Sequence, residues 1–162
     1  MKRNTIITVA LLGVIAPATL IVAHQDDPKI KDRQPAVKAD AYRADRDFGQ
    51  ERSLGFSSEN VQLKSWLPLS EFGTNADNGN DCWGYVSPSG REYALVGTYD
   101  GTGIVEITEP GNAQVIALLN GNDSLWRDIK TYGTYMYCVS EGGGGIQVFN
   151  LANIDSGNVQ TL

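Results

Sequence analysis

A four-residue string, Asn-Gly-Asn-Asp, occurs twice in this chain, and its spacing limits what the chain can fold into. The copies occupy residues 78–81 and 120–123, which places them 42 residues apart, and a tryptophan follows each copy (Trp83 and Trp126). A fixed period of this length indicates one supersecondary unit that is repeated and stacked on its neighbours. The repeat therefore predicts at least two similar units packed side by side.

Five short runs, three between the two strings and two after the second string, predict strands. Each run is four to six residues long, is rich in β-branched or aromatic side chains, and is bounded by Gly, Asn, Asp or Pro. The runs are 93–97, 103–107, 115–119, 135–139 and 146–151. Short strands repeated every 42 residues are typical of β-propellers, in which each blade is a sheet of four antiparallel strands. We therefore predict an all-β fold with an incomplete propeller of about two blades.

The repeat also divides the chain. We expect a partial propeller over residues 58–162, with an outer strand at 59–70, one blade at 81–119 and a truncated blade at 123–162. Two blades cannot close a ring of four to eight. The remaining blades of a longer chain are therefore the first partner that the sequence predicts, and a small unit that oligomerises into a ring is the alternative.

The N-terminus is typical of exported proteins. A basic start, Met1-Lys2-Arg3, precedes an apolar run that ends at Ala23, which predicts a signal peptide over 1–23; an uncleaved membrane anchor is the alternative. Residues 24–57 carry alternating charges and few large apolar side chains, so we expect a flexible spacer there. The expected location is extracytoplasmic: periplasm, cell surface or medium.

Charge and histidine content exclude several functions. Residues 59–162 carry four basic and twelve acidic side chains, a net charge of −8, which disfavours a nucleic-acid partner. His24 is the chain's single histidine and lies at the predicted cleavage point, so a Ser-His-Asp triad or a histidine-based metal site is excluded within this chain.

The two cysteines leave two alternatives open. Cys82 and Cys138 either pair as a disulfide, as an oxidising compartment favours, or stay as buried thiols.

Two groups of residues are candidates for binding. Asp77, Asn80 and Asp81 lie in an Asn- and Asp-rich turn whose oxygens suit Ca²⁺, although the same residues stabilise turns by bonding their own backbone. The second group consists of Trp83, Trp126, Arg127, Asp128 and Glu141. Arg127 and Asp128 would face a polar ligand in the central channel, or Arg127 would pair with a carboxylate while the tryptophans pack between blades. Glu141 is a single candidate carboxylate. No catalytic residues and no other cofactor are predicted.

Five strings carry a resemblance to a known family: 80–85, 92–97, 103–107, 124–130 and 140–151, of which Trp126-Arg127-Asp128-Ile129-Lys130 is the most specific. They resemble the start of the choice-of-anchor B family, secreted bacterial proteins related to LVIVD-repeat propellers. The resemblance implies a propeller, export and a C-terminal anchoring tail, so contact with a membrane would be through the signal or through an anchor that this sequence lacks. It implies no reaction.

The predicted function is therefore that of a binding scaffold. We expect an exported bacterial propeller protein that binds a protein or carbohydrate partner without catalysis in this chain. The alternative is an extracellular hydrolase or lyase that uses carboxylates in the central channel of the propeller. A binding module predicts no paired acids with shifted pKa values near the channel. An enzyme predicts two or more carboxylates that converge there, at least one of them from blades missing here.

Overall fold

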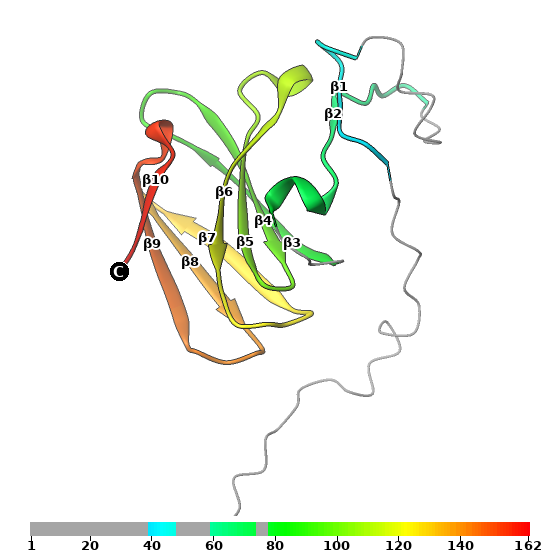
Figure 1. Ribbon diagram of the computed structural model, residues 1–162. Coiled ribbons are helices and arrows are strands. Elements are labelled where there is room, and N and C mark those ends of the chain that lie inside the picture. The colour runs from blue at the N-terminus through cyan, green and yellow to red at the C-terminus, as the bar shows by residue number, and fades with distance from the viewer. Residues whose placement is uncertain (1–38, 48–58, 74–77) are drawn as a thin grey trace, which may run out of the picture. The chain divides into compact units, whose positions relative to one another are not determined.

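The computed structural model describes residues 39–47, 59–73 and 78–162 (Figure 1). All of them belong to the second of two contact units, 34–162. The predicted signal peptide, residues 1–23, lies outside the described residues. Within the described ranges, the regular structure consists of strands and short 3-10 helices, and no helix is long and apolar enough to cross a membrane.

Two four-stranded sheets make up most of the described chain. The first sheet has the order β3-β4-β5-β6, and its strands are Gly79–Val86, Glu92–Thr98, Gly101–Glu106 and Gln114–Asn120. The second has the order β7-β8-β9-β10, and its strands are Arg127–Tyr132, Tyr135–Ser140, Ile146–Asn153 and Asn158–Thr161. All neighbours are antiparallel. The prediction of an all-β fold with four-stranded antiparallel sheets is thus confirmed.

One core joins the two sheets. Leu95 and Ile104 lie opposite each other on β4 and β5, and both are fully buried. Met136 and Cys138 on β8 face them from the second sheet and are also fully buried. Ile129, Phe149 and Leu151 of the second sheet, and Ile154 just after β9, complete this core. Each sheet therefore hides an apolar face by packing against the other.

The two sheets are stacked head to tail. The 42-residue period makes Tyr93 and Leu95 of the first sheet equivalent to Tyr135 and Tyr137 of the second, and the pairing agrees: Tyr93 pairs with Glu106, and Tyr135 with Asn150. Yet the first pair is buried between the sheets, while the second pair lies on the outer side of the second sheet. The face that carries Tyr93 and Leu95 points toward the second sheet, and the equivalent face of the second sheet points away from the first. The two sheets therefore have the same orientation along the stack.

The repeated Asn-Gly-Asn-Asp strings are not structurally equivalent. The first copy enters β3, whereas the second leaves β6 and continues into the connection to β7. The strand register explains the difference: Trp83 pairs with Leu95, but Lys130, rather than Trp126, pairs with Tyr137. The β3–β4 turn has five residues and the β7–β8 turn has two, and this difference shifts the first strands relative to the sequence repeat.

The segment before β3 contains a short strand pair and a 3-10 helix. Within the predicted spacer, 24–57, the described part forms β1 (Tyr42–Arg43), which pairs with β2 (Ser65–Trp66). The predicted outer strand, 59–70, covers β2 and the start of a 3-10 helix, η3 (Leu69–Phe72), which follows Pro68. The buried Arg43 donates from Nε to the Ala113 carbonyl at 2.5 Å, which fixes β1 beside the first sheet.

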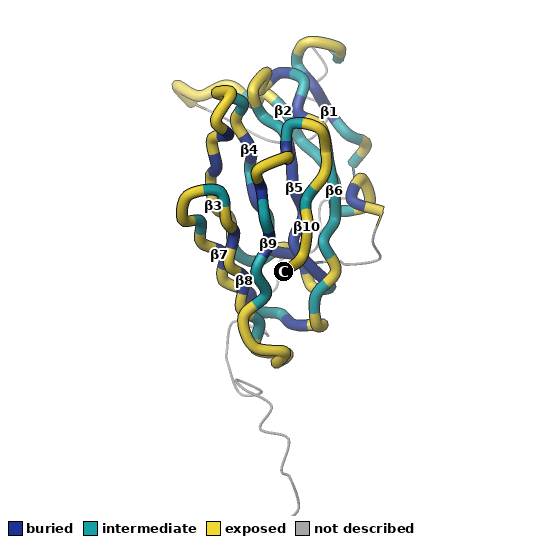
Figure 2. Tube along the Cα trace, turned by 90° about the vertical axis from the view of Figure 1, so that its left-hand side faces the viewer, coloured by how far each residue is buried: buried dark blue, intermediate teal, exposed yellow. Residues whose placement is uncertain are grey.

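The far face of the first sheet is also covered. A second apolar cluster places Leu67, Leu69 and Phe72 against Ala94, Val96, Val105 and Val115 of that sheet. The first sheet is therefore buried on both sides, and the second on one. Figure 2 shows the result as dark blue along β4 and β5 and as yellow in the turns.

The buried contact between the sheets should dominate stability. Ile104→Ala is expected to lower the free energy of unfolding by about 2–5 kcal/mol, because the lost methyl groups leave a cavity between two packed faces. Val61→Ala, at a residue that is 72% exposed, is the control and should change it by about 0.5 kcal/mol or less. Urea denaturation of both variants measures the difference, and equal effects would contradict a shared core.

Candidate functional site

Five residues on the first strands of the two sheets form a mixed aromatic and charged cluster, which we call the first-strand cluster. Asp81 and Trp83 come from β3, and Asp128, Lys130 and Thr131 come from β7. The Trp83 indole donates from Nε1 to Thr131 Oγ1 at 3.0 Å. The Ile129 backbone N–H donates to Asp81 Oδ2 at 2.7 Å. These two bonds join the first strands of neighbouring sheets directly.

Lys130 lies at the centre of the first-strand cluster. Its Nζ donates to Asp128 Oδ1 at 2.6 Å, lies 3.8 Å from Asp81 Oδ2, and sits 4.4 Å from the centre of the Trp83 ring. A cation over an indole face is attracted by the ring quadrupole, and the carboxylates add to this attraction. The ammonium is therefore held by two acids and one aromatic ring.

The electrostatics of the cluster favour charged carboxylates. The hydrogen bond from Lys130 is the main cause that lowers the pKa of Asp128, and the same bond raises the pKa of Lys130. A general acid needs the opposite shift, a carboxyl pKa raised toward neutral pH. Asp128 and Lys130 are therefore both charged at neutral pH and form an ion pair within the first-strand cluster.

Arg127 makes hydrogen bonds that join the two sheets. Its side chain leaves β7 on the face opposite to Asp128, is buried, and donates from Nη2 to the Asn122 carbonyl at 2.8 Å. Longer bonds reach the Thr98 carbonyl and Gln147 Oε1, both at 3.4 Å. Burial lowers the pKa of Arg127. The guanidinium therefore fastens the β6–β7 connection between the sheets, away from the first-strand cluster.

The same connection holds the turn between β4 and β5. Gly121 N–H donates to the Asp100 carbonyl, and Ser124 N–H donates to the Tyr99 carbonyl, each at 2.8 Å. On the other side of the turn, Tyr99 N–H donates to the Asn78 carbonyl at 3.2 Å. Both Asn-Gly-Asn-Asp strings thus form backbone hydrogen bonds to the β4–β5 turn, one on each side, although they occupy different positions in their sheets.

The remaining predicted binding residues lie at this connection. Trp126 is half-buried, and its indole Nε1 is enclosed without a hydrogen-bond partner among the residues that the structure describes. Glu141 is exposed in the turn after β8, where its N–H donates to the Trp126 carbonyl at 3.3 Å. Of the five residues in the predicted binding group, the structure therefore brings only Trp83 and Asp128 together in the first-strand cluster.

The residues proposed for calcium use their oxygens within the chain. Asn80 Oδ1 accepts from the Asp81 N–H at 2.8 Å, and Asp81 Oδ2 accepts from Ile129. Asp77 lies outside the described residues. Over the described ranges, no group of three or more His, Cys, Asp or Glu side chains is arranged to hold a metal ion. The Asn80 bond is local, as in the turn-stabilising alternative, whereas Asp81 bonds the backbone of the neighbouring sheet.

The predicted disulfide is not formed, because Cys82 and Cys138 are both free thiols. Cys82 is exposed on β3, whereas Cys138 is enclosed between the sheets, where Thr102 Oγ1 lies 3.5 Å from its sulfur. Burial raises the pKa of the Cys138 thiol, so it behaves as a small apolar core residue.

A second charged network, which the sequence did not indicate, joins the first sheet to the segment after β9. We call it the Asp155 clasp. Asp155, in the 3-10 helix η5 (Ile154–Ser156), accepts from Ser89 Oγ at 2.6 Å and from the Tyr93 hydroxyl at 2.8 Å. Arg91 donates to the Asp155 carbonyl at 2.5 Å and forms a two-pronged ion pair with Glu106. The first sheet is thereby tied to the end of the second.

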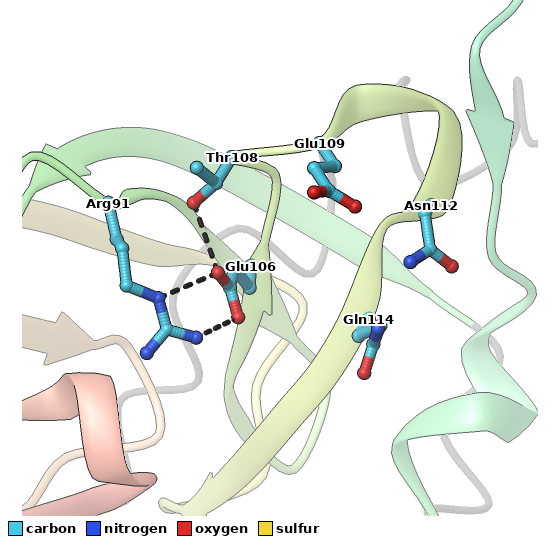
Figure 3. A pocket seen from close by; sticks show the side chains of 6 residues that line it. All are labelled: Arg91, Glu106, Thr108, Glu109, Asn112 and Gln114. Atoms are coloured by element: carbon cyan, nitrogen blue, oxygen red, sulfur yellow. Dashed lines mark hydrogen bonds and ion pairs between the residues drawn. The ribbon is translucent and has the colours of Figure 1, made fainter. Parts of the chain in front are cut away.

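The Arg91–Glu106 pair lines a shallow polar hollow of about 120 Å³ (Figure 3). Thr108 adds a hydrogen bond to Glu106 at 3.1 Å, so both carboxylate oxygens are already engaged. Glu109, Asn112 and Gln114 complete the lining. The hollow adjoins the clasp and carries no cluster of reactive groups.

No family model, curated protein or solved structure matches this chain. The resemblance to the choice-of-anchor B family therefore stays a prediction.

Removal of the Arg127 hydrogen bonds should destabilise the fold. Arg127→Met keeps an unbranched side chain but removes the guanidinium bonds to the Asn122 and Thr98 carbonyls, and we expect a loss of about 1–3 kcal/mol in the free energy of unfolding. Arg46→Met, at an exposed residue, is the control. Chemical denaturation provides the measurement. An equally or more stable Arg127→Met variant would mean that burying the guanidinium costs more than its bonds contribute.

The Asp155 clasp should make stability depend on acid pH. Hydrogen bonds from Ser89 and Tyr93 lower the pKa of Asp155, and the bond from Arg91 lowers that of Glu106. Because the folded state binds fewer protons than the unfolded state, the contribution is complete above the ordinary carboxyl pKa of about 4 and is lost as pH falls below it. In urea titrations from neutral pH to pH 3, Asp155→Asn should flatten this loss, and the exposed Asp40→Asn should retain it.

Proposed function

We propose that this chain supplies blades to an exported bacterial β-propeller of the choice-of-anchor B type, which serves as a scaffold for binding a protein or carbohydrate partner. The observation that carries the proposal is the head-to-tail stacking of two four-stranded sheets whose first strands lie together, bonded through Trp83–Thr131 and Asp81–Ile129. This is the order that successive propeller blades have around an axis.

The open side of the second sheet supports a stacked assembly. Tyr135 and Tyr137 occupy the positions that Tyr93 and Leu95 occupy in the first sheet, and Val139 and Ile146 extend the same face. In the first sheet these positions are covered by the next sheet, whereas Ile146 is 65% exposed. A further sheet of the same kind would bury this face and would continue the propeller.

The first-strand cluster is the proposed contact for a ligand. It combines an indole that is 39% exposed with charged and hydroxyl groups on one edge of the stack. Aromatic rings of this kind stack on sugar rings or anchor protein partners, and the polar groups provide direction. The lowered pKa of Asp128 keeps that carboxylate ionised, so it can accept hydrogen bonds from a polar ligand but is unsuited to be the general acid of a hydrolase.

A comparison of binding with turnover tests the proposal. The chain is applied to an array of bacterial polysaccharides and extracellular proteins, and the same polysaccharides are assayed for reducing ends and for unsaturated products. We expect retention without turnover, and a loss of affinity of about tenfold or more in Trp83→Ala, which removes the aromatic contact. Trp126→Phe, just before β7 and outside the first-strand cluster, is the control. Released product that disappears in Asp128→Asn would instead establish the enzyme.

A further inference from the structure

The two ends of the stack differ in how they are covered. At one end, the outer face of the second sheet exposes a row of large side chains: Tyr132, Tyr135, Tyr137, Val139 and Ile146. We call this row the open face. At the other end, the outer face of the first sheet carries Ala94, Val96, Val105 and Ile107, and residues 64–73 lie over it. We call residues 64–73 the cap.

The cap is seated closely on the first sheet. The Phe72 ring lies so near Gly103 that a Cβ placed there would come within 2.2 Å of it, so the absence of a side chain at Gly103 makes room for the ring. Phe72 is itself buried. Tight contact between a ring and a bare backbone indicates a fitted surface rather than a loosely covered one.

Polar bonds hold the cap in place around this ring. Ser65 Oγ donates to the Pro110 carbonyl at 2.6 Å. The Arg43 side chain binds the Ala113 carbonyl and lies 3.4 Å from Glu71, which connects β1, the cap and the first sheet. These bonds involve only a few groups at the margin of an apolar contact. The cap is therefore a separate layer added to the sheet rather than one of its strands.

The surface beneath the cap matches the open face of another copy. Inside the chain, the face that carries Tyr93 and Leu95 packs against the face that carries Met136 and Cys138. The 42-residue period makes Tyr135 and Tyr137 equivalent to the first pair, and Ala94 and Val96 equivalent to the second. The open face of one copy and the covered face of the next are thus the two halves of an interface that the chain already makes once.

We propose that the cap blocks head-to-tail self-association, and that its release lets the open face of a second copy dock on the first sheet. The inference depends on the stacking of the sheets and not on the proposed ligand. Because the two surfaces differ, the contact is heterologous, so it leads to a ring where the rotation closes and to a filament where it does not. The cap keeps the stack from growing at that end.

Loosening the cap in the full chain tests this inference. In Phe72→Ala, the ring is lost from its seat, and multi-angle light scattering should show a mass that rises with protein concentration to about twice that of the parent chain or more. The parent and the matched control Phe72→Tyr should keep one mass. The double variant with Phe72→Ala and Tyr137→Asp should return to that mass, since a charge on the open face prevents docking.

Each other result counts against the inference. A Phe72→Ala chain that keeps one mass while its circular dichroism is native overturns it. Equal association in the double variant also overturns it, because the association then comes from unspecific exposure. If Phe72→Ala does not fold, Arg43→Ala loosens the same cap without touching the apolar face, and a folded Arg43→Ala chain of unchanged mass overturns it as well. A parent chain that associates as strongly as Phe72→Ala would show that the cap blocks nothing.

Discussion

The contact between the buried faces of the two sheets is the interaction on which the rest of this structure depends. Neither sheet could hide its apolar side alone, since a single four-stranded sheet has two faces and no interior. Leu95 and Ile104 on one side and Met136 and Cys138 on the other remove that exposure together. This apolar contact sets the distance between the two sheets. Three sets of polar interactions surround it and depend on that distance: the Arg127 bonds, the Asp155 clasp and the first-strand cluster.

The strands and the class of fold could be predicted because their signal is local. Short β-branched and aromatic runs between Gly and Asn residues gave β4, β5, β6, β8 and β9 nearly at their observed bounds. Stacking in one direction was also implied, since a repeat presents the same face each time. The pairing of the first strands was not, because the five-residue turn before Glu92 moves Trp83 out of register with Trp126. Identical strings therefore ended in different structures.

The site shows the same division between local and distant information. Trp83 and Asp128 were identifiable, and Lys130 could have been, since it is two residues after Asp128 and so shares its face of the strand. The clasp could not be found, because Asp155 meets Ser89 and Tyr93 across more than 60 positions of sequence. The burial of Arg127 and the docking of β1 on the first sheet are long-range in the same way. The composition of 24–57 indicates a charged segment with few large apolar side chains, but it does not reveal that Arg43 bonds the Ala113 carbonyl.

The unequal turns give the successive joints of the stack different chemistry. The five-residue β3–β4 turn is long enough to bring Ser89 to the carboxylate of the next sheet, and Arg91 at its end reaches the neighbouring backbone. The β7–β8 turn contains only Gly133 and Thr134. This shorter turn has no counterpart of Ser89 or Arg91, so a layer that covers the tyrosines of the second sheet would lack these two polar contacts. The contact between the two sheets of this chain therefore includes polar bonds from the β3–β4 turn, whereas a contact at the open face would depend more on its tyrosines.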